Sequence, residues 1–164
     1  MSRHNDTLLQ DDGIPSMENA VVAIFHTEWN HEVVDRLLEG CQRTLVKYKV
    51  GKVVTVKVPG AVELHNACRR YYESTARSAT SPDALVMLGC VIRGGTPHFD
   101  YVCQAVTEGA THLNLTLPVP VIFGVLTVDT LQQATDRTGG SHGHKGEEAA
   151  VTALKMIALN RQLS

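Results

Sequence analysis

Short apolar runs alternate four times with helix-like segments along this 164-residue chain, and that alternation limits the fold more than any other feature. The apolar runs are AVVAIF (20–25), VVTVKV (53–58), ALVMLGCVI (84–92) and VPVIFGVLT (119–127). Each has the length of a strand, and a continuous apolar run is typical of a strand buried on both faces. Such alternation predicts a parallel sheet with right-handed crossovers and helices on both faces.

The segments between these runs have the periodicity of amphipathic helices. Helices are expected over 31–48, over 61–77, from about Pro97 toward Leu113, over 129–137, and after a glycine-rich loop at 138–146. In the second of these helices the residues expected to face inward are Val62, Leu64, Ala67, Cys68 and Tyr71. We therefore predict an α/β three-layer sandwich with a parallel four-stranded sheet.

Residues 1–18 lack periodicity and carry Gly13 and Pro15, so we expect an N-terminal arm outside the core, followed by one domain over 19–164. A formal net charge of −2 gives no footprint for nucleic acid or an anionic membrane. No run approaches the roughly 18 apolar residues of a membrane span. The N-terminal segment is too polar for a secretory signal, so a cytoplasmic protein is expected.

Four cysteines are widely spaced, each has apolar neighbours, and no CxxC pair exists: Cys41, Cys68, Cys90 and Cys103. This pattern favours small buried thiols, reduced in the cytosol, over zinc binding or disulfide chemistry. The two histidines of HGH (142–144) come without a carboxylate or thiol cluster, so we predict no metal site there.

The segment RGGTPHF (93–99) follows the third apolar run, and ligands of parallel α/β sheets bind outside the carboxyl ends of the strands. Thr96 is a good helix N-cap and Pro97 fits the first helical position. Free amide groups at a helix start favour an anion such as phosphate, and His98 could move protons there. A plain capped turn would explain Gly-Thr-Pro, but it would leave Arg93 and His98 unexplained.

Three further features at the same predicted edge each have a functional and a structural interpretation. Trp29, the only tryptophan, could stack on a planar heterocycle or pack at the rim. Glu63, in PGAVE (59–63), could accept hydrogen bonds from a ligand or interact with the helix dipole. Arg137 and Lys145 bracket the glycine-rich loop; the pair could lie on a solvated surface, or the arginine could be delivered to a phosphate site.

Taken together, these motifs resemble the lumazine synthase family of riboflavin biosynthesis. The similar strings are WN (29–30), PGAVE (59–63), GCVIRGGTPHFDYV (89–102), PVIFGVLT (120–127) and QATDRTGGSHGHKGEEAA (133–150). They occur in the family's order and span most of residues 20–160, and the long central motif is specific.

The resemblance implies a flavodoxin-like fold and a defined reaction. The family condenses 5-amino-6-ribitylamino-2,4-pyrimidinedione with 3,4-dihydroxy-2-butanone 4-phosphate, releases phosphate and water, and needs neither cofactor nor metal. By motif position, the expected site residues are Trp29 for stacking on the pyrimidinedione; Ala61 and Glu63 for the ribityl chain; backbone groups of Val91 and Ile92 for the pyrimidine; Gly95, Thr96 and Arg137 for phosphate; His98 as proton shuttle; and Phe123 and Lys145 lining the site, often from a neighbouring subunit.

The resemblance also implies a homo-oligomer built from pentamers, either free, paired, or in shells of sixty subunits, with riboflavin synthase as a pathway partner. The absence of an insertion between Arg137 and Lys145 favours the shell, whereas Pro15 argues against the N-terminal strand addition that helps shells form. Two positions depart from the family pattern. His144 stands where asparagine is common, and Glu28 where a small or basic residue is usual.

Two other functions compete with this expectation. One is a related enzyme that handles a different phosphosugar. The other is a catalytically inactive shell or flavin-binding protein on the same scaffold, which loss of His98 or Arg137 would have favoured; both residues are present.

Overall fold

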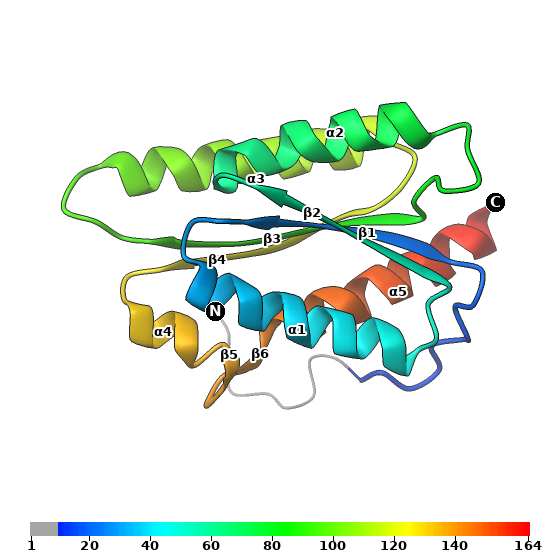
Figure 1. The fold of residues 1–164 in the computed structure, drawn as a ribbon, viewed down its shortest axis with the longest axis horizontal. Helices are drawn as coiled ribbons and strands as arrows, with labels where there is room; N and C mark the ends of the chain where they lie inside the picture. The colour runs from blue at the N-terminus through cyan, green and yellow to red at the C-terminus, as the bar shows by residue number, and fades with distance from the viewer. Residues whose placement is uncertain (1–9) are drawn as a thin grey trace.

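Strands and helices alternate in the computed structural model, which describes residues 10–164 (Figure 1). The main strands are β1 (Val21–Thr27), β2 (Lys52–Val58), β3 (Ala84–Ile92) and β4 (Val121–Val128). The helices are α1 (His31–Lys47), α2 (Leu64–Thr75), α3 (His98–Thr116), α4 (Leu131–Thr135) and α5 (Lys145–Leu163). A 3₁₀ turn, η1 (Ala61–Glu63), precedes α2, and two short strands, β5 (Thr138–Gly140) and β6 (Gly143–His144), precede α5.

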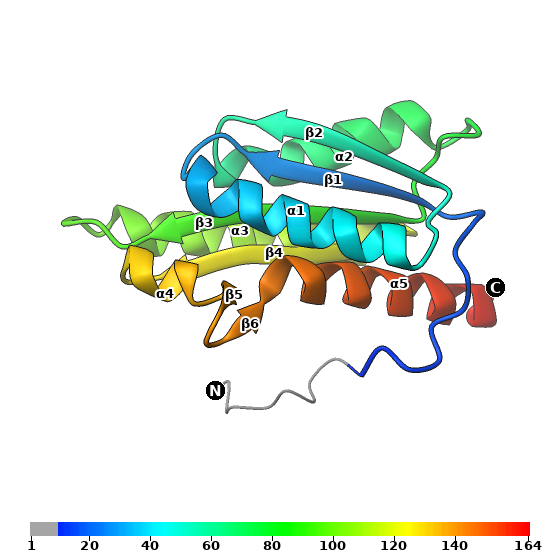
Figure 2. The ribbon, with the colours of Figure 1, turned by 60° about the horizontal axis from the view of Figure 1, so that its bottom comes forward.

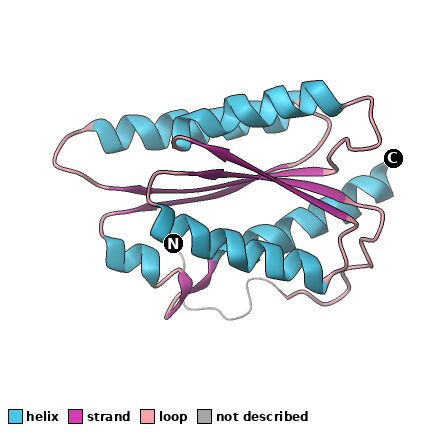
Figure 3. Ribbon diagram, in the orientation of Figure 1, coloured by secondary structure: helices cyan, strands magenta, loops and turns pink. Residues whose placement is uncertain are grey.

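The four main strands form one parallel sheet in the order β2-β1-β3-β4. Helices α2 and α3 cover one face of this sheet, and α1 and α5 cover the other (Figures 1 and 3). The predicted three-layer sandwich with a parallel four-stranded sheet is therefore confirmed. The bounds of β3 coincide with the apolar run at 84–92.

The hydrophobic core has two halves, one on each face of the sheet. Successive side chains of a strand point to opposite faces, so Val22 and Ile24 pack toward α1 and α5, whereas Ala23 and Phe25 pack toward α2 and α3. The Phe25 ring also meets the Tyr71 ring edge-on, with centroids 5.7 Å apart. Because both faces of the central strands are covered, their sequences are continuously apolar rather than alternating.

The prediction for the start of the second helix was wrong at Val62. Leu64 and Cys68 are fully buried, as expected, but Val62 is 39% exposed. The segment Ala61–Glu63 forms a 3₁₀ turn before α2 begins, and a 3₁₀ turn has fewer residues per turn than an α-helix. The change in pitch moves Val62 off the face that Leu64 and Cys68 share.

The glycine-rich segment contains more structure than the predicted loop. Strands β5 and β6 pair antiparallel across a turn, and α5 begins directly after them at Lys145. Gly139 and Gly143 have φ values of 104° and 76°, a backbone region that residues with a side chain rarely adopt. The two glycines therefore allow a tight hairpin where a loop without strands was expected.

Residues 1–9 of the predicted arm lie outside the described residues, and residues 10–18 contain neither helix nor strand. The expectation that the arm stays outside the core was wrong at Met17, whose side chain is fully buried in the half-core of α1 and α5. Asp11 accepts hydrogen bonds from Lys47 and Tyr48 near the end of α1. These bonds lower the pKa of the Asp11 carboxyl to about 2.

The prediction of buried thiols is confirmed for three of the four cysteines and was wrong at Cys103. Cys41, Cys68 and Cys90 are buried, Cys103 on α3 is partly exposed, and all four are free thiols. Burial raises the pKa of Cys41 to about 12 and that of Cys90 to about 11. Over the part of the chain that the structure describes, none of the helices combines the length and the apolar character needed to span a bilayer.

Candidate functional site

The carboxyl ends of all four main strands lie at one edge of the sheet (Figure 2). The segments that follow them are the turn 28–30, the segment 59–63, the loop 93–97 and the start of α4. In a parallel sheet the crevice outside this edge is where ligands bind. We call this edge the rim.

Trp29 stands on the rim in a turn that Asn30 stabilises. The Glu28 N–H donates to the Val58 carbonyl at 2.8 Å, which carries the β1–β2 pairing into the turn. Asn30 adopts the left-handed conformation, with φ 59° and ψ 38°, and its Nδ2 donates to the Cys90 carbonyl of β3 at 2.7 Å. Held this way, the Trp29 side chain is 74% exposed, so its ring faces outward rather than filling the core.

The segment η1 places Ala61 and Glu63 next to this turn. The Trp29 N–H donates to the Pro59 carbonyl, and η1 packs beside β3 and α3. The Glu63 N–H donates to the Gly60 carbonyl at 3.2 Å. Glu63 itself is exposed. An exposed carboxylate thus follows the segment that is bonded to the Trp29 turn.

Strand β3 extends past β1 and leaves part of its backbone open. Pairing with β1 ends at Leu88, whereas pairing with β4 continues to Ile92. Backbone groups of successive residues point to opposite neighbours. The Arg93 N–H donates to β4, so Ile92, like Cys90, directs its backbone groups to the open side, while those of Val91 face β4.

Gly95 and Thr96 in the loop after β3 are exposed, and so is His98, the first residue of α3. A Cβ built on Gly94 or Gly95 would meet no atom within 4 Å, so the chain's own packing does not require glycine at either position. Pro97 has helical angles (φ −62°, ψ −4°), as expected for a first helical position, but α3 begins at His98 without a side-chain cap, so the hydrogen bond expected of a Thr96 cap does not form.

Arg93 contributes to the architecture of this loop rather than to an anion site. Its Nε donates to Asp129 at 2.7 Å, its Nη1 donates to Asp100 at 3.2 Å, and its guanidinium carbon lies 4.0 Å from the Phe99 ring centroid. These contacts join the ends of β3 and β4 to the first turn of α3. The charge of Arg93, which the sequence offered for binding an anion, is therefore already neutralised by the carboxylates of Asp100 and Asp129.

Arg137 and Lys145 flank the hairpin of β5 and β6, which lies on the side of the sheet that α1 and α5 cover (Figures 1 and 2). The Lys145 N–H donates to the Arg137 carbonyl at 2.8 Å, so the backbone brings the two cations together. The Arg137 guanidinium donates to the Gln133 carbonyl, and Lys145 pairs with Glu148. The loop 93–97 instead leads into α3, on the opposite side of the sheet.

Phe123 is not at the rim of its own chain. It pairs with Met87 in the middle of β3, and five residues separate it from the end of β4 at Val128. At a rise of about 3.3 Å per residue, that separation is roughly 16 Å. The ring is 41% exposed on an edge strand. One chain therefore brings together the predicted residues of the β1, β2 and β3 ends, but neither Phe123 nor the hairpin cations join them.

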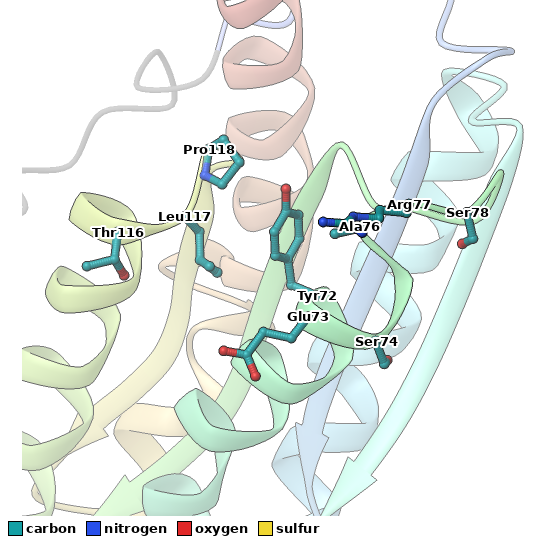
Figure 4. A pocket seen from close by; sticks show the side chains of 9 residues that line it. All are labelled: Tyr72, Glu73, Ser74, Ala76, Arg77, Ser78, Thr116, Leu117 and Pro118. Carbon is teal, nitrogen blue, oxygen red and sulfur yellow. The ribbon is translucent and has the colours of Figure 1, made fainter.

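An open hollow lies at the other end of the sheet (Figure 4). It is lined by the last turn of α2, the segment after it and the α3–β4 connection, that is, by residues 72–74, 76–78 and 116–118. None of the predicted site residues lines it, so its position does not match the chemistry at the rim. Among residues 10–164 no group of three or more His, Cys, Asp or Glu side chains is placed to hold a metal ion.

Asn30 is the functional residue that sequence reasoning left without a role. Its importance depends on a carbonyl sixty positions away, which no local pattern reports. The available signal was its residue type, because asparagine is enriched in the left-handed conformation and tolerates it where most residues do not.

A parallel sheet with an exposed aromatic ring, a carboxylate, open amide groups and an imidazole at one rim defines an α/β protein that takes small ligands at its strand ends. The family model described as 6,7-dimethyl-8-ribityllumazine synthase matches residues 19–161. The chain belongs to this family of enzymes, as its motifs predicted.

Curated relatives of the same description cover nearly all of the chain. A protein of Parabacteroides distasonis is 47% identical over 148 residues, which are 89% of this chain and 89% of the relative. A protein of Porphyromonas gingivalis is 44% identical over 160 residues, 96% of each chain. A third, of Kocuria rhizophila, is 47% identical over 135 residues, 81% of this chain and 82% of the relative.

Proposed function

We propose that the chain condenses 5-amino-6-ribitylamino-2,4-pyrimidinedione with 3,4-dihydroxy-2-butanone 4-phosphate to give 6,7-dimethyl-8-ribityllumazine, phosphate and water. The observation that carries this proposal is the grouping of Trp29, Glu63, the open end of β3 and His98 along one rim of a family member. Each group matches one chemical part of the two substrates.

The pyrimidinedione binds against Trp29. A planar heterocycle gains by stacking on an exposed indole, and the polar edge of the ring can bond to the open backbone groups at Ile92, whereas those of Val91 face β4. The ribityl hydroxyls then reach Ala61 and the Glu63 carboxylate. The support is that the turn that holds Trp29 is bonded both to Pro59, just before η1, and to Cys90 near the end of β3.

The phosphate binds at the start of α3, where Gly95 and Thr96 present backbone amides near the positive end of the helix dipole. The open space beside Gly94 and Gly95 supports this assignment, because the chain itself gives no reason for glycine there. Arg137 supplies the cation, since Arg93 is already paired with Asp129 and Asp100.

The chemistry needs positioning more than a strong catalyst. The 5-amino group attacks the ketone and loses water to form an imine, a C–O bond breaks as phosphate leaves, and the ribitylamino nitrogen closes the ring with loss of a second water. Phosphate is a fair leaving group, so holding the two substrates together supplies much of the acceleration. His98, exposed at the first position of α3, transfers protons between these steps.

A homo-oligomer built from pentamers completes the site. Phe123 and the hairpin with Arg137 and Lys145 lie away from their own chain's rim, so a neighbouring subunit supplies them. Nine large apolar side chains that are exposed in one chain support an assembly: Trp29, Val46, Val62, Tyr101, Leu115, Phe123, Leu131, Leu159 and Leu163. Light scattering tests this: a stable species of the 17.8 kDa chain mass at micromolar concentration contradicts it.

We place the enzyme in the cytoplasm, with residues 19–164 as its catalytic domain and riboflavin synthase as the next enzyme to use its product. The four free thiols suit a reducing compartment. Co-purification with riboflavin synthase, measured against each protein alone, tests the partnership.

The decisive experiment follows the lumazine product by its visible absorption while each substrate is varied in turn. Arg137→Ala should raise the KM for the butanone phosphate by about 10- to 150-fold, the equivalent of one charged hydrogen bond. The KM for the pyrimidinedione should change little. Arg70→Ala is the matched control, because Arg70 is an exposed arginine whose nearest carboxylate, on Glu73, is 3.9 Å away.

Absence of lumazine from the wild-type reaction contradicts the proposed function. If Arg137→Ala weakens both substrates equally, the residue organises the loop or the interface instead of binding phosphate.

A further inference from the structure

Arg137 and Lys145 are separated by a hairpin whose shape sets their spacing. Thr138 of β5 pairs with His144 of β6, and the Lys145 N–H donates to the Arg137 carbonyl at 2.8 Å. The backbones of the two residues are therefore tied to the two ends of the hairpin, and whatever anchors the hairpin also sets where their side chains begin.

The His144 ring lies directly against Gly40 in the middle of α1. A Cβ built on Gly40 would lie 2.0 Å from Cε1 of His144 and 2.5 Å from its Nδ1, and the three atoms nearest to that Cβ all belong to this ring. On the other side, a Cβ on Gly139 of β5 would lie 3.6 Å from Cδ2 of His144. The ring is thus wedged between α1 and β5.

The glycine at position 40 has a cost that this contact explains. Glycine inside a helix is less favourable than alanine, because it loses more backbone freedom on folding. Gly40 is buried and lies nine residues into α1, far from either end. Only the absence of a side chain there leaves room for the imidazole.

The same ring also begins α5. The Glu147 N–H donates to Nδ1 of His144 at 3.4 Å, so the imidazole acts as the N-cap of the helix, although the bond is long. Just beyond, a Cβ on Gly146 would lie 2.0 Å from the Leu37 carbonyl oxygen, so the two helices meet at backbone distance. Arg43 and Glu147 add an ion pair across the same junction.

We propose that His144 is a positioning residue for the two cations that flank the hairpin: its ring, seated on Gly40, fixes the hairpin against α1 and thereby places Arg137, which binds the phosphate, and Lys145, which lines the site. The inference rests on the proposed function for the identity of the anion. It adds a residue pair, Gly40 and His144, that touches no substrate but determines where the cations lie.

A double-mutant cycle of Gly40→Ala and His144→Ala tests this pairing. In the wild-type background Gly40→Ala forces the ring out, and His144→Ala removes it, so each should raise the KM for the butanone phosphate by about tenfold, as small misplacements of binding groups do. The KM for the pyrimidinedione should stay within about twofold. In the His144→Ala background, Gly40→Ala should cause no further rise, because the atoms it would meet are gone.

Stability should separate positioning from folding. Added to His144→Ala, Gly40→Ala should raise the thermal midpoint by about 2–4 °C, because alanine is the better helix former. Should Gly40→Ala alone fail to fold, the double variant and His144→Ala still test the proposal. Equal rises in both KM values, or a lower thermal midpoint with an unchanged KM for the butanone phosphate, would overturn it.

Calorimetric titration with inorganic phosphate distinguishes failure of this inference from failure of the proposed function. If the wild-type chain binds phosphate but makes no lumazine, the proposed function is rejected. The inference about His144 still holds in that case if Gly40→Ala and His144→Ala each weaken phosphate binding about tenfold. Phosphate binding that neither substitution changes rejects the inference whatever the activity.

Discussion

Replacing Asn30 should cost stability in two parts that the structure allows to be separated. The Asn30 side chain donates to the Cys90 carbonyl at 2.7 Å, and its backbone has φ 59°. Losing the hydrogen bond costs about 1 kcal/mol net, and placing alanine in the left-handed region adds about 1–2 kcal/mol. Asn30→Ala should therefore lower the free energy of unfolding by about 2–3 kcal/mol, and Asn30→Gly, which tolerates this φ, by only about 1 kcal/mol.

Urea unfolding followed by circular dichroism measures these differences. Protein concentration must be held constant, because the proposed assembly would couple stability to concentration. Lys49 is the matched control: it has φ 54° at the end of α1, so Lys49→Gly should be neutral or stabilising. Equal losses for Asn30→Ala and Asn30→Gly, or losses below about 0.5 kcal/mol, would refute the reasoning from the left-handed turn and its bond.

Three further predictions concern a buried histidine and the rim. Burial, aided by Lys57 and opposed by Asp35, lowers the pKa of His26, so the unfolded chain binds more protons below the ordinary value of 6.5. The free energy of unfolding should therefore fall as the pH drops below about 6.5 and level off below the folded pKa, and His26→Gln should flatten this part of the profile in urea titrations. His98→Ala should slow turnover by roughly 10²-fold without abolishing it, and a wild-type rate would remove the imidazole from the mechanism. Trp29→Ala should weaken pyrimidinedione binding by about 1–3 kcal/mol; unchanged affinity would make the ring a packing residue of the rim.

The sequence predicts the fold correctly where the local pattern of apolar residues matches the burial of those residues in the structure. Strand β3 coincides with its apolar run because both of its faces are covered, so every position favours the same residue type. Leu64 and Cys68 are buried as the helical period requires. Val62 was wrong because a 3₁₀ turn changed the pitch over only three residues, which periodicity over a longer window cannot resolve.

The sequence indicated which types of residue follow the strand ends at the rim, but it did not indicate which residues they contact. Trp29 is exposed and the space beside Gly95 is open, so both positions are accessible to a ligand, and their roles in binding stay predictions. Arg93 had the right charge for phosphate, yet Asp129, thirty-six positions later, already pairs with it. Likewise, the seat of His144 on Gly40 joins residues of α1 and β6 that only the tertiary fold brings together. Such pairings depend on chain topology, which a single sequence does not display.

The burial of the thiols makes this chain suited to site-directed labelling. Cys41, Cys68 and Cys90 are enclosed, and their raised pKa keeps them as unreactive thiols at neutral pH. Cys103 is the partly exposed one, although burial and Asp100 raise its pKa as well, so mildly alkaline conditions favour its modification. A maleimide dye would thus attach chiefly to α3, five residues beyond His98, and would provide a spectroscopic reporter close to the rim without any cysteine having to be removed first.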